Sequence, residues 1–293
     1  MKRALILGLA LVFLAFLVLS LWPVPDAKAH PYFAGAPSDR AEIIAHGAGQ
    51  GHAPPNTIVA LQIAHEMGAD VLEVDVQQTR DGVLILRHDD TLDRTTDMSG
   101  MIADLDWSEI SQADAGATWI VDGMSFVGRG IKVPRLAEAL AAFPGERWIV
   151  EIKNDTARAA FSMCDEIKSA DAQERVLVAS FHDAAMSAFR AACPTVATSA
   201  SSKEVRNFVI AARLGLSRFV STPAVALQIP TQSNGLDLSH PRVIAAAQAR
   251  GIRIQYWTIN DRTEIERLLN AGADGVMTDY VDRGRNAIAS LAD

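Results

Sequence analysis

Residues 148–179, WIVEIKNDTARAAFSMCDEIKSADAQERVLVA, carry the clearest signal of how this chain folds. Trp148–Ile152 and Val176–Ala179 are short apolar runs, which predict strands, and Ala157–Ser169 between them has the pattern of an amphipathic helix. A strand, a helix and a second strand in this order predict two parallel strands that are joined by a helical crossover.

The same alternation extends from this stretch toward both ends of the chain. The predicted strands are 42–45, 71–76, 148–152, 176–179, 196–198, 219–221, 252–257 and 275–278. The predicted helices are 57–67, 136–143, 157–169, 184–191, 203–214, 241–250, 261–270 and a last helix after residue 278. Eight strand–helix units in about 250 residues predict a TIM-type (β/α)8 barrel. A doubly wound open sheet is the alternative.

Two segments depart from this alternation. Val83–Leu86 follows the turn Asp81-Gly82, so it is expected to extend the sheet or to form a hairpin arm. Residues 90–130 have weak periodicity and many turn residues, and we expect them to form a small insertion in the barrel.

Residues 1–24 are predicted to be one hydrophobic helix, either a transmembrane anchor or a cleaved signal segment. Lys2 and Arg3 precede the uncharged run 4–22, whose length approaches that of a bilayer core of about 30 Å. Ala27-Lys28-Ala29 has the small-x-small pattern of a cleavage site, which leaves both possibilities open. Positive charges before the run place the body outside the cytoplasm, either membrane-anchored in a periplasmic or extracellular position or, after cleavage, secreted. Residues 25–40 are expected to be a linker, and residues 41–293 the barrel.

The net charge indicates which partners are excluded, and the positions of the two cysteines indicate whether they form a disulfide. The formal net charge is −8, which argues against a nucleic-acid partner because phosphate backbones select basic surfaces. Cys164 lies within a predicted helix and Cys193 directly precedes Pro194. We therefore expect two buried thiols and no essential disulfide.

Acidic residues stand on one face of two predicted strands. Glu73 and Asp75 are two residues apart, so both side chains point to the same side of strand 71–76. Glu151 and Lys153 repeat this spacing in the next strand. Carboxylates that share a face repel one another unless a cation lies between them, and oxygen ligands of this kind suit Mg²⁺ or Ca²⁺. The alternative is a set of simple salt bridges, and Lys153 is also a candidate contact for a phosphate oxygen.

Histidines and one large aromatic residue follow other predicted strands. His46 ends strand 42–45, and His88 ends the apolar arm 83–86 and is followed by Asp89. Imidazole titrates near neutral pH and serves as a general acid or base, so both are catalytic candidates, although each alone is also explained as an ordinary polar residue. Asp89 is a candidate to orient His88. Trp257 is expected either to pack in the core or to form a wall for the alcohol part of a substrate.

Taken in order, these segments resemble the glycerophosphodiester phosphodiesterase family from about residue 43 to residue 282. The matching motifs are Ala45–Thr57, Glu73-Val74-Asp75, Asp81-Gly82, His88-Asp89, Asp93–Thr96, Glu151-Ile152-Lys153, Trp257–Asn260 and Gly272–Asp279. The resemblance implies a β/α barrel with a small insertion and hydrolysis of glycerophosphodiesters to sn-glycerol 3-phosphate and an alcohol. It also implies a site that consists of a divalent cation on Glu73, Asp75 and Glu151, the acid/base pair His46 and His88, and Lys153 on the phosphate.

Two positions depart from the family pattern. Gly47 stands where the family has an arginine after the first histidine, and Pro55 replaces a glutamate. An arginine grips phosphate with two parallel hydrogen bonds, which glycine cannot supply. We expect Arg87 or His52 to provide part of the missing positive charge.

Other functions remain open at this stage. A lysophospholipase D that acts on membrane lipids would use the same residues, with a lysophospholipid as its substrate and the N-terminal segment holding it at the membrane. A non-catalytic barrel that binds phosphorylated ligands would explain the missing arginine and glutamate. A phosphoinositide-type lyase that stops at a cyclic phosphate would share the paired histidines.

Overall fold

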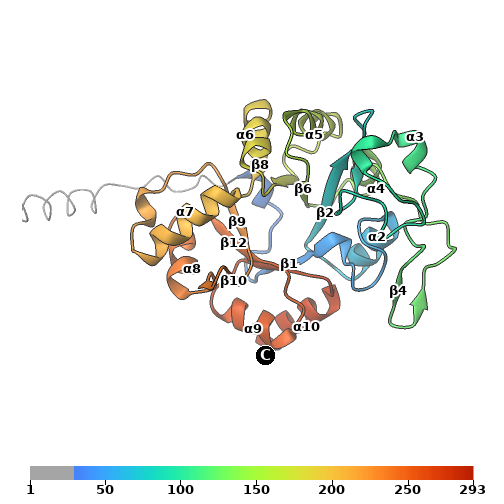
Figure 1. The fold of residues 1–293 in the computed structure, drawn as a ribbon. Coiled ribbons are helices and arrows are strands. Elements are labelled where there is room, and N and C mark those ends of the chain that lie inside the picture. The colour runs from blue at the N-terminus through green and yellow to red at the C-terminus, as the bar shows by residue number, and fades with distance from the viewer. Residues whose placement is uncertain (1–29, 293) are drawn as a thin grey trace, which may run out of the picture.

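The computed structural model describes residues 30–292, and parallel strands form a barrel at the centre of this part of the chain (Figure 1). The barrel strands are β1 (Glu42–Ala45), β2 (Val71–Gln78), β6 (Trp148–Ile152), β7 (Val176–Ala179), β8 (Ala197–Thr198), β9 (Ala226–Ile229), β12 (Arg253–Tyr256) and β13 (Gly275–Thr278). They pair in the order β8-β7-β6-β2-β1-β13-β12-β9. A parallel bridge between Ser199 and Ala226 joins the two ends of this order. The predicted TIM-type barrel is therefore confirmed, and the open sheet is wrong.

Helices surround the strands on all sides of the barrel (Figure 1). They are α2 (Ile58–Glu66), α4 (Leu136–Ala142), α5 (Ala157–Ser169), α6 (Asp183–Ala192), α7 (Ser202–Arg213), α8 (Pro241–Gln248), α9 (Arg262–Asn270) and α10 (Val281–Ala292). Thr57, Thr156 and Asp261 cap the first turns of α2, α5 and α9, because each side chain accepts a hydrogen bond from the backbone three residues later.

Alternate residues of the strands fill the barrel interior. The inner cluster consists of Tyr32, Ile44, Val71, Ile149, Leu177, Ala197, Ala226 and Met277, nearly one from each strand. Since side chains alternate along a strand, the next inward positions after Ile44, Ile149 and Met277 are His46, Glu151 and Asp279. The alternation of side chains along the strands thus places these three polar residues at the C-terminal end of the barrel.

Residues 30–33 close the opposite end of the barrel. Tyr32 lies in the short helix η1 (Pro31–Phe33) and is fully buried. The guanidinium of Arg147 lies 5.4 Å from its ring centre and pairs with Glu42 at 2.5 Å. The prediction of a linker over 25–40 is wrong for residues 30–33, because a fully buried tyrosine removes a large apolar area from water.

The segment after β2 contains the predicted hairpin and insertion. β3 (Leu84–Leu86) pairs antiparallel with β2, with Val76 opposite Leu86, which confirms the hairpin. The insertion contains η3 (Ile102–Asp104), α3 (Trp107–Ile110), β4 (Ile120–Val121) and β5 (Met124–Ser125). It projects at one side of the barrel, beside α2 and α4 (Figure 1).

One predicted strand is misplaced. Residues 217–219 form a short helix, η4 (Ser217–Phe219), and the strand of this unit is β9. Phe219 suggests a strand by its type, yet its side chain is half-exposed, unlike those of the barrel core. A two-stranded hairpin, β10 (Gln232–Ser233) and β11 (Leu236–Asp237), follows β9.

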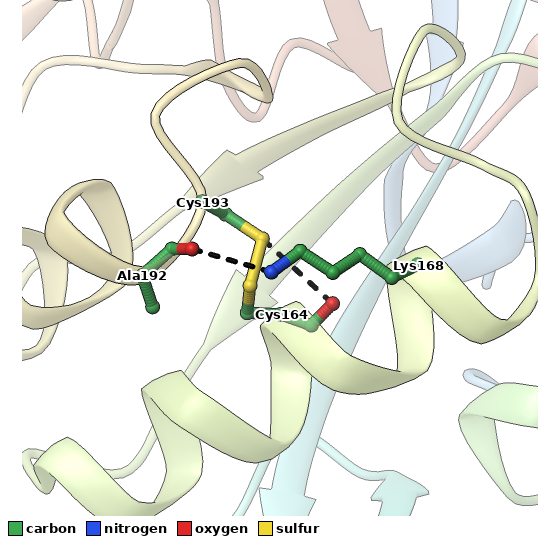
Figure 2. The surroundings of a disulfide bond; sticks show 4 residues. All are labelled: Cys164, Lys168, Ala192 and Cys193. Carbon is green, nitrogen blue, oxygen red and sulfur yellow. Dashed lines mark hydrogen bonds between the residues drawn. A yellow bond between two sulfur atoms is a disulfide. The ribbon is translucent and has the colours of Figure 1, made fainter.

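Cys164 of α5 and Cys193 after α6 form a disulfide (Figure 2). The prediction of two buried thiols is therefore wrong. α5 and α6 cover the neighbouring strands β6 and β7, and this packing brings the two Cα atoms to 5.8 Å. Lys168 links the same two elements, because its Nζ donates to the carbonyl oxygen of Ala192 at 3.4 Å.

The hydrophobic segment predicted at residues 1–24 lies outside the described residues. Among residues 30–292, no helix combines the length and the apolar character that crossing a bilayer requires.

Candidate active site at the C-terminal end of the barrel

A cavity of about 740 Å³ opens at the C-terminal ends of the barrel strands. His46, Glu73, Asp75, His88, Glu151, Lys153 and Trp257 all line it. Arg87, predicted to contact the substrate, does not line this cavity, and neither do His52 and Asp89. The barrel therefore brings together side chains that are far apart in the chain.

Three carboxylates meet at one end of this cavity. Glu73 and Asp75 of β2 and Glu151 of β6 each offer an oxygen atom, and these atoms lie within 4.8 Å of one another. Their proximity follows from the parallel pairing of β2 with β6, in which Asp75 lies directly beside Glu151. The backbone N–H of Gly47 donates to Glu73 Oε2 at 2.6 Å, and Asn56 Nδ2 donates to Asp75 Oδ2 at 2.9 Å. These contacts hold the oxygen atoms in place.

The electrostatics of the cluster favour a cation. Burial and the neighbouring charge of Asp75 raise the pKa of Glu73 to about 8. Burial also raises the pKa of Glu151. The pKa of Asp75 is lowered despite its burial, because the Lys153 ammonium lies beside it. Negative charge that is desolvated and crowded in this way is what a bound divalent cation relieves. The donor set therefore fits a metal ion.

Lys153 places a positive charge against two carboxylates of the cluster. Its Nζ lies 2.9 Å from Asp75 Oδ1 and 2.9 Å from Glu151 Oε1. Both carboxylates raise the pKa of Lys153, although burial opposes them. The salt bridge that the sequence offered as an alternative is therefore formed by Lys153, whereas Glu73 makes no ion pair with a lysine among residues 30–292.

His46 is held by a residue that the sequence did not single out. His46 Nδ1 lies 2.8 Å from Asp279 Oδ1. Asp279 in turn accepts hydrogen bonds from Gln50 Nε2 at 2.7 Å and from Asn260 Nδ2 at 2.6 Å. Burial alone would lower the pKa of His46, but the hydrogen bond to Asp279 and the charge of Glu73 raise it to about 9.

His88 faces the same cavity from the end of the β2–β3 hairpin. Its Nδ1 lies 2.8 Å from Asp89 Oδ1, as the sequence suggested. Arg94 of the insertion donates to both oxygen atoms of Asp89 and is the main reason that the pKa of Asp89 falls to about 2. Asp89 is thereby kept ionised. Because Asp89 contacts Nδ1, the Nε2 atom of His88 is not involved in this contact.

Trp257 and Arg87 occupy different surroundings. The ring of Trp257 lines the cavity and meets Phe181 edge to face, with 5.6 Å between the ring centres. Arg87 is buried, and its guanidinium donates to Thr95 of the insertion. The structure does not bring Arg87 to the cavity, because its buried guanidinium contacts the insertion, whereas the adjacent His88 lines the cavity.

The conformation of the loop after β1 suits a glycine at position 47. Gly47 has a φ of +54°, a left-handed conformation that side chains rarely adopt, and its N–H is the donor to Glu73. Glycine at this position thus orients one carboxylate of the cluster. Pro55 lies in the same loop, and a Cβ on Gly47 would stand 3.6 Å from the Cβ of Pro55.

The position of Asp279 beside His46 follows from the closure of the barrel. β1 pairs with β13 so that Ala45 lies beside Thr278. In any closed barrel the first and last strands are neighbours, so the residues that follow them, His46 and Asp279, must lie side by side.

Comparison with known proteins gives a consistent result. Residues 46–283 match the model of the glycerophosphoryl diester phosphodiesterase family. A glycerophosphodiester phosphodiesterase from Caldanaerobacter subterraneus subsp. tengcongensis is 29% identical over 247 residues, which cover 81% of this chain and 93% of the relative. Another from Bacillus altitudinis is 28% identical over 253 residues, which cover 83% and 96%.

A solved structure has the same fold. The phosphodiesterase of Oleispira antarctica, in complex with its product sn-glycerol-3-phosphate, superposes with a TM-score of 0.70 at 26% identity. The superposition covers 86% of this chain and 98% of that one. The match of the family model to most of the barrel places the chain in one family: it belongs to the glycerophosphoryl diester phosphodiesterases, which are phosphoric diester hydrolases.

Proposed function

We propose that this protein hydrolyses glycerophosphodiesters to sn-glycerol 3-phosphate and an alcohol, with a divalent cation and two histidines. The observation that carries the proposal is that three carboxylates and two imidazoles line one cavity at the mouth of the barrel. The Oleispira antarctica relative, whose structure contains sn-glycerol-3-phosphate, supports this choice of product.

Glu73, Asp75 and Glu151 are the residues that would hold the cation. An all-oxygen set of carboxylates favours Mg²⁺ or Ca²⁺ over softer metals. When bound, such a cation offsets the negative charge of the phosphate and of its transition state. Lys153 lies against two of these carboxylates, so its ammonium is placed to contact a phosphate oxygen from the same side.

The two histidines take different parts in the reaction. Hydrolysis joins the oxygen of water to phosphorus and breaks the bond between phosphorus and the alcohol oxygen, which then needs a proton. His46 is assigned as the general acid, because the Asp279 carboxylate against its Nδ1 favours the protonated imidazole. His88 is the general base that takes the proton from water, with Asp89 orienting its ring.

We also propose that the barrel acts outside the cytoplasm. The uncharged run at 4–22 with Lys2 and Arg3 before it favours export. The disulfide between Cys164 and Cys193 supports the same location, since disulfides persist in oxidising compartments and are rare in the cytosol.

The central test is an assay with glycerophosphocholine. The protein should release sn-glycerol 3-phosphate and choline, and EDTA should stop the reaction until Mg²⁺ or Ca²⁺ is restored. His46→Ala and Glu73→Ala should each lower kcat by on the order of 10²-fold or more. His65→Ala is a matched control, because His65 pairs with Glu146 outside the cavity and should leave kcat unchanged.

Three results would contradict the proposal. Full activity in EDTA would exclude the cation, and a cyclic glycerol phosphate as the final product would indicate a lyase. No turnover of any phosphodiester, together with tight binding of glycerol 3-phosphate, would indicate a non-catalytic binding protein.

A further inference from the structure

The cavity has a second part that the proposed reaction does not use. We call it the apolar lobe and define it by Phe181, Val209, Ile210, Pro230, Leu236 and Trp257, all of which line the cavity. The lobe lies beyond the ends of β7, β9 and β12. Val209 and Ile210 come from α7, and Leu236 comes from the β10–β11 hairpin.

Charge is distributed very unevenly between the two parts of the cavity. We call the part of the cavity that contains the three carboxylates the metal end. Six titratable residues line this end: His46, Glu73, Asp75, His88, Glu151 and Lys153. Among the described residues that line the rest of the cavity, Arg206 alone is charged, and none is acidic. A site for the ammonium of choline or ethanolamine would be expected to offer a carboxylate or an open aromatic cage. The two rings present, Phe181 and Trp257, instead contact each other edge to face.

The lobe opens to solvent between apolar side chains. Phe181, Ile210 and Leu236 are 49%, 48% and 49% exposed. Large apolar side chains left open around a cavity mark a surface that an apolar ligand covers. They come from three separate elements and converge on one cavity, so they are not single apolar residues scattered over the surface.

The size of the cavity also exceeds the needs of a small diester. At about 740 Å³ it falls in the upper part of the range for drug-sized ligands, about 300–1,000 Å³. The polar diester occupies the metal end, and the apolar lobe is continuous with it in the same cavity. The remaining space therefore suits a group that is attached to the diester and is itself apolar.

We infer that the apolar lobe binds the single hydrocarbon chain of a lysophospholipid. This inference rests on the proposed function and narrows its substrate class to glycerophosphodiesters that carry one acyl chain on the glycerol. The chemistry is unchanged: water adds to phosphorus, the bond from phosphorus to the headgroup oxygen breaks, and the headgroup alcohol takes a proton. The products are a lysophosphatidic acid and the free alcohol.

A chain-length series tests the inference. Choline release is measured for glycerophosphocholine and for its hexanoyl, octanoyl and decanoyl lysophosphatidylcholine relatives, all below their micelle-forming concentrations. Each buried methylene contributes about fourfold in binding, so kcat/KM should rise on the order of tenfold for each two-carbon step while the lobe is being filled.

Two substitutions at the lobe should reduce this gain. Ile210→Ser and Leu236→Ser should each lower the ratio of kcat/KM for the decanoyl substrate to that for glycerophosphocholine by on the order of tenfold. Leu214→Ser is the matched control, because Leu214 lies at the end of the same helix, is 67% exposed and does not line the cavity. This control should leave the ratio unchanged.

The possible outcomes separate the inference from the proposed function. Hydrolysis of glycerophosphocholine with no effect of chain length would overturn the inference and leave the proposed function intact. A preference for glycerophosphocholine over glycerophosphoethanolamine, with no effect of chain length, would show that the lobe binds the choline group instead. Failure to hydrolyse glycerophosphocholine, glycerophosphoethanolamine and all of the lysophosphatidylcholines would overturn the proposed function itself.

Discussion

His46 Nδ1 lies 2.8 Å from Asp279 Oδ1, although the two residues are separated by 233 positions in the chain. They lie side by side because the barrel pairs its first strand with its last. Asp279 is fixed from its other side by Asn260 and Gln50. The carboxylate therefore sets both the orientation and the charge of the imidazole.

We predict that Asp279→Asn lowers kcat by on the order of 10²-fold, because an amide neither stabilises the imidazolium nor fixes its ring in the same way. It should also move the alkaline limb of the pH profile to lower pH. A general acid works only while it is protonated, so activity falls as pH rises through the pKa of His46, which is about 9 with Asp279 in place. Steady-state kinetics over a range of pH values measures both effects.

Asp282→Asn serves as the control for this prediction. Asp282 lies three residues further along and pairs with His52 at 3.1 Å, outside the cavity. Its replacement should change neither kcat nor the pH profile. A lower kcat in Asp279→Asn with an unshifted alkaline limb would show that Asp279 does not act through the charge of His46.

We predict that the contribution of Glu73 makes the stability of the metal-free protein fall as pH rises from about 4.5 to about 8. Burial and Asp75 raise the pKa of Glu73 from 4.5 to about 8, so the folded state prefers the protonated acid. A raised carboxyl pKa contributes stability below the unfolded value, and this stability is lost as pH rises through the folded value. Calorimetry in EDTA should show the loss, which is a few kcal/mol at most.

The same experiment contains its own comparisons. Glu73→Gln should reduce the decrease, since the amide does not ionise, and the part that remains comes from His46, whose pKa is raised from 6.5 to about 9. Mg²⁺ or Ca²⁺ should restore the stability of the unaltered protein at pH 9. An equal loss of stability in Glu73→Gln would assign the effect to another group.

Local patterns in the sequence predict the strands and the carboxylate cluster well. The predicted bounds of Glu42–Ala45, Trp148–Ile152, Val176–Ala179 and Gly275–Thr278 are confirmed. Each is a short run flanked by polar or turn residues, so the local signal is sufficient. The spacing of Glu73 and Asp75 likewise determines that both face the same side of their strand.

Features that depend on packing between distant segments are not visible locally. β9 was missed because Ala226–Ile229 contains one β-branched residue, whereas Phe219 and Val220 are stronger strand formers by type. The disulfide depends on two helices lying side by side, which the position of either cysteine alone does not reveal. The apolar lobe likewise combines residues from α7, a hairpin and three strand ends.

The disulfide between Cys164 and Cys193 should contribute to stability and not to catalysis. It closes a loop with a sequence separation of 29 residues, for which chain entropy gives about 3–4 kcal/mol. We predict that replacing both cysteines with serine lowers the free energy of unfolding by about this amount and leaves kcat unchanged, because neither cysteine lines the cavity. Chemical denaturation and the glycerophosphocholine assay test the two parts, and a large loss of kcat at a temperature where the variant is folded would contradict the second.

Glu166 provides a pH-dependent contribution to stability that is independent of the active site. Burial raises the pKa of Glu166 to about 7, and Arg135 and the backbone N–H of Ala137 only partly offset it. Its Oε2 is buried and has no hydrogen-bond partner among the described residues. The ionised side chain therefore destabilises the fold at pH 8, whereas at pH 4 it is protonated in both the folded and unfolded states and has no such effect. Glu166→Gln should raise the free energy of unfolding by about 1–2 kcal/mol more at pH 8 than at pH 4.

Asp165→Asn, at the exposed neighbouring position on the same helix, is the matched control for Glu166→Gln and should show no such difference between the two pH values. The comparison of two pH values separates ionisation from packing, since any change in how the amide fits is present at both. Because Glu166 lies on α5, outside the cavity, kcat should not change. Urea denaturation of the three proteins at pH 4 and pH 8 measures the effect. An equal gain at both values would show that the carboxyl group of Glu166 is not kept protonated by its burial.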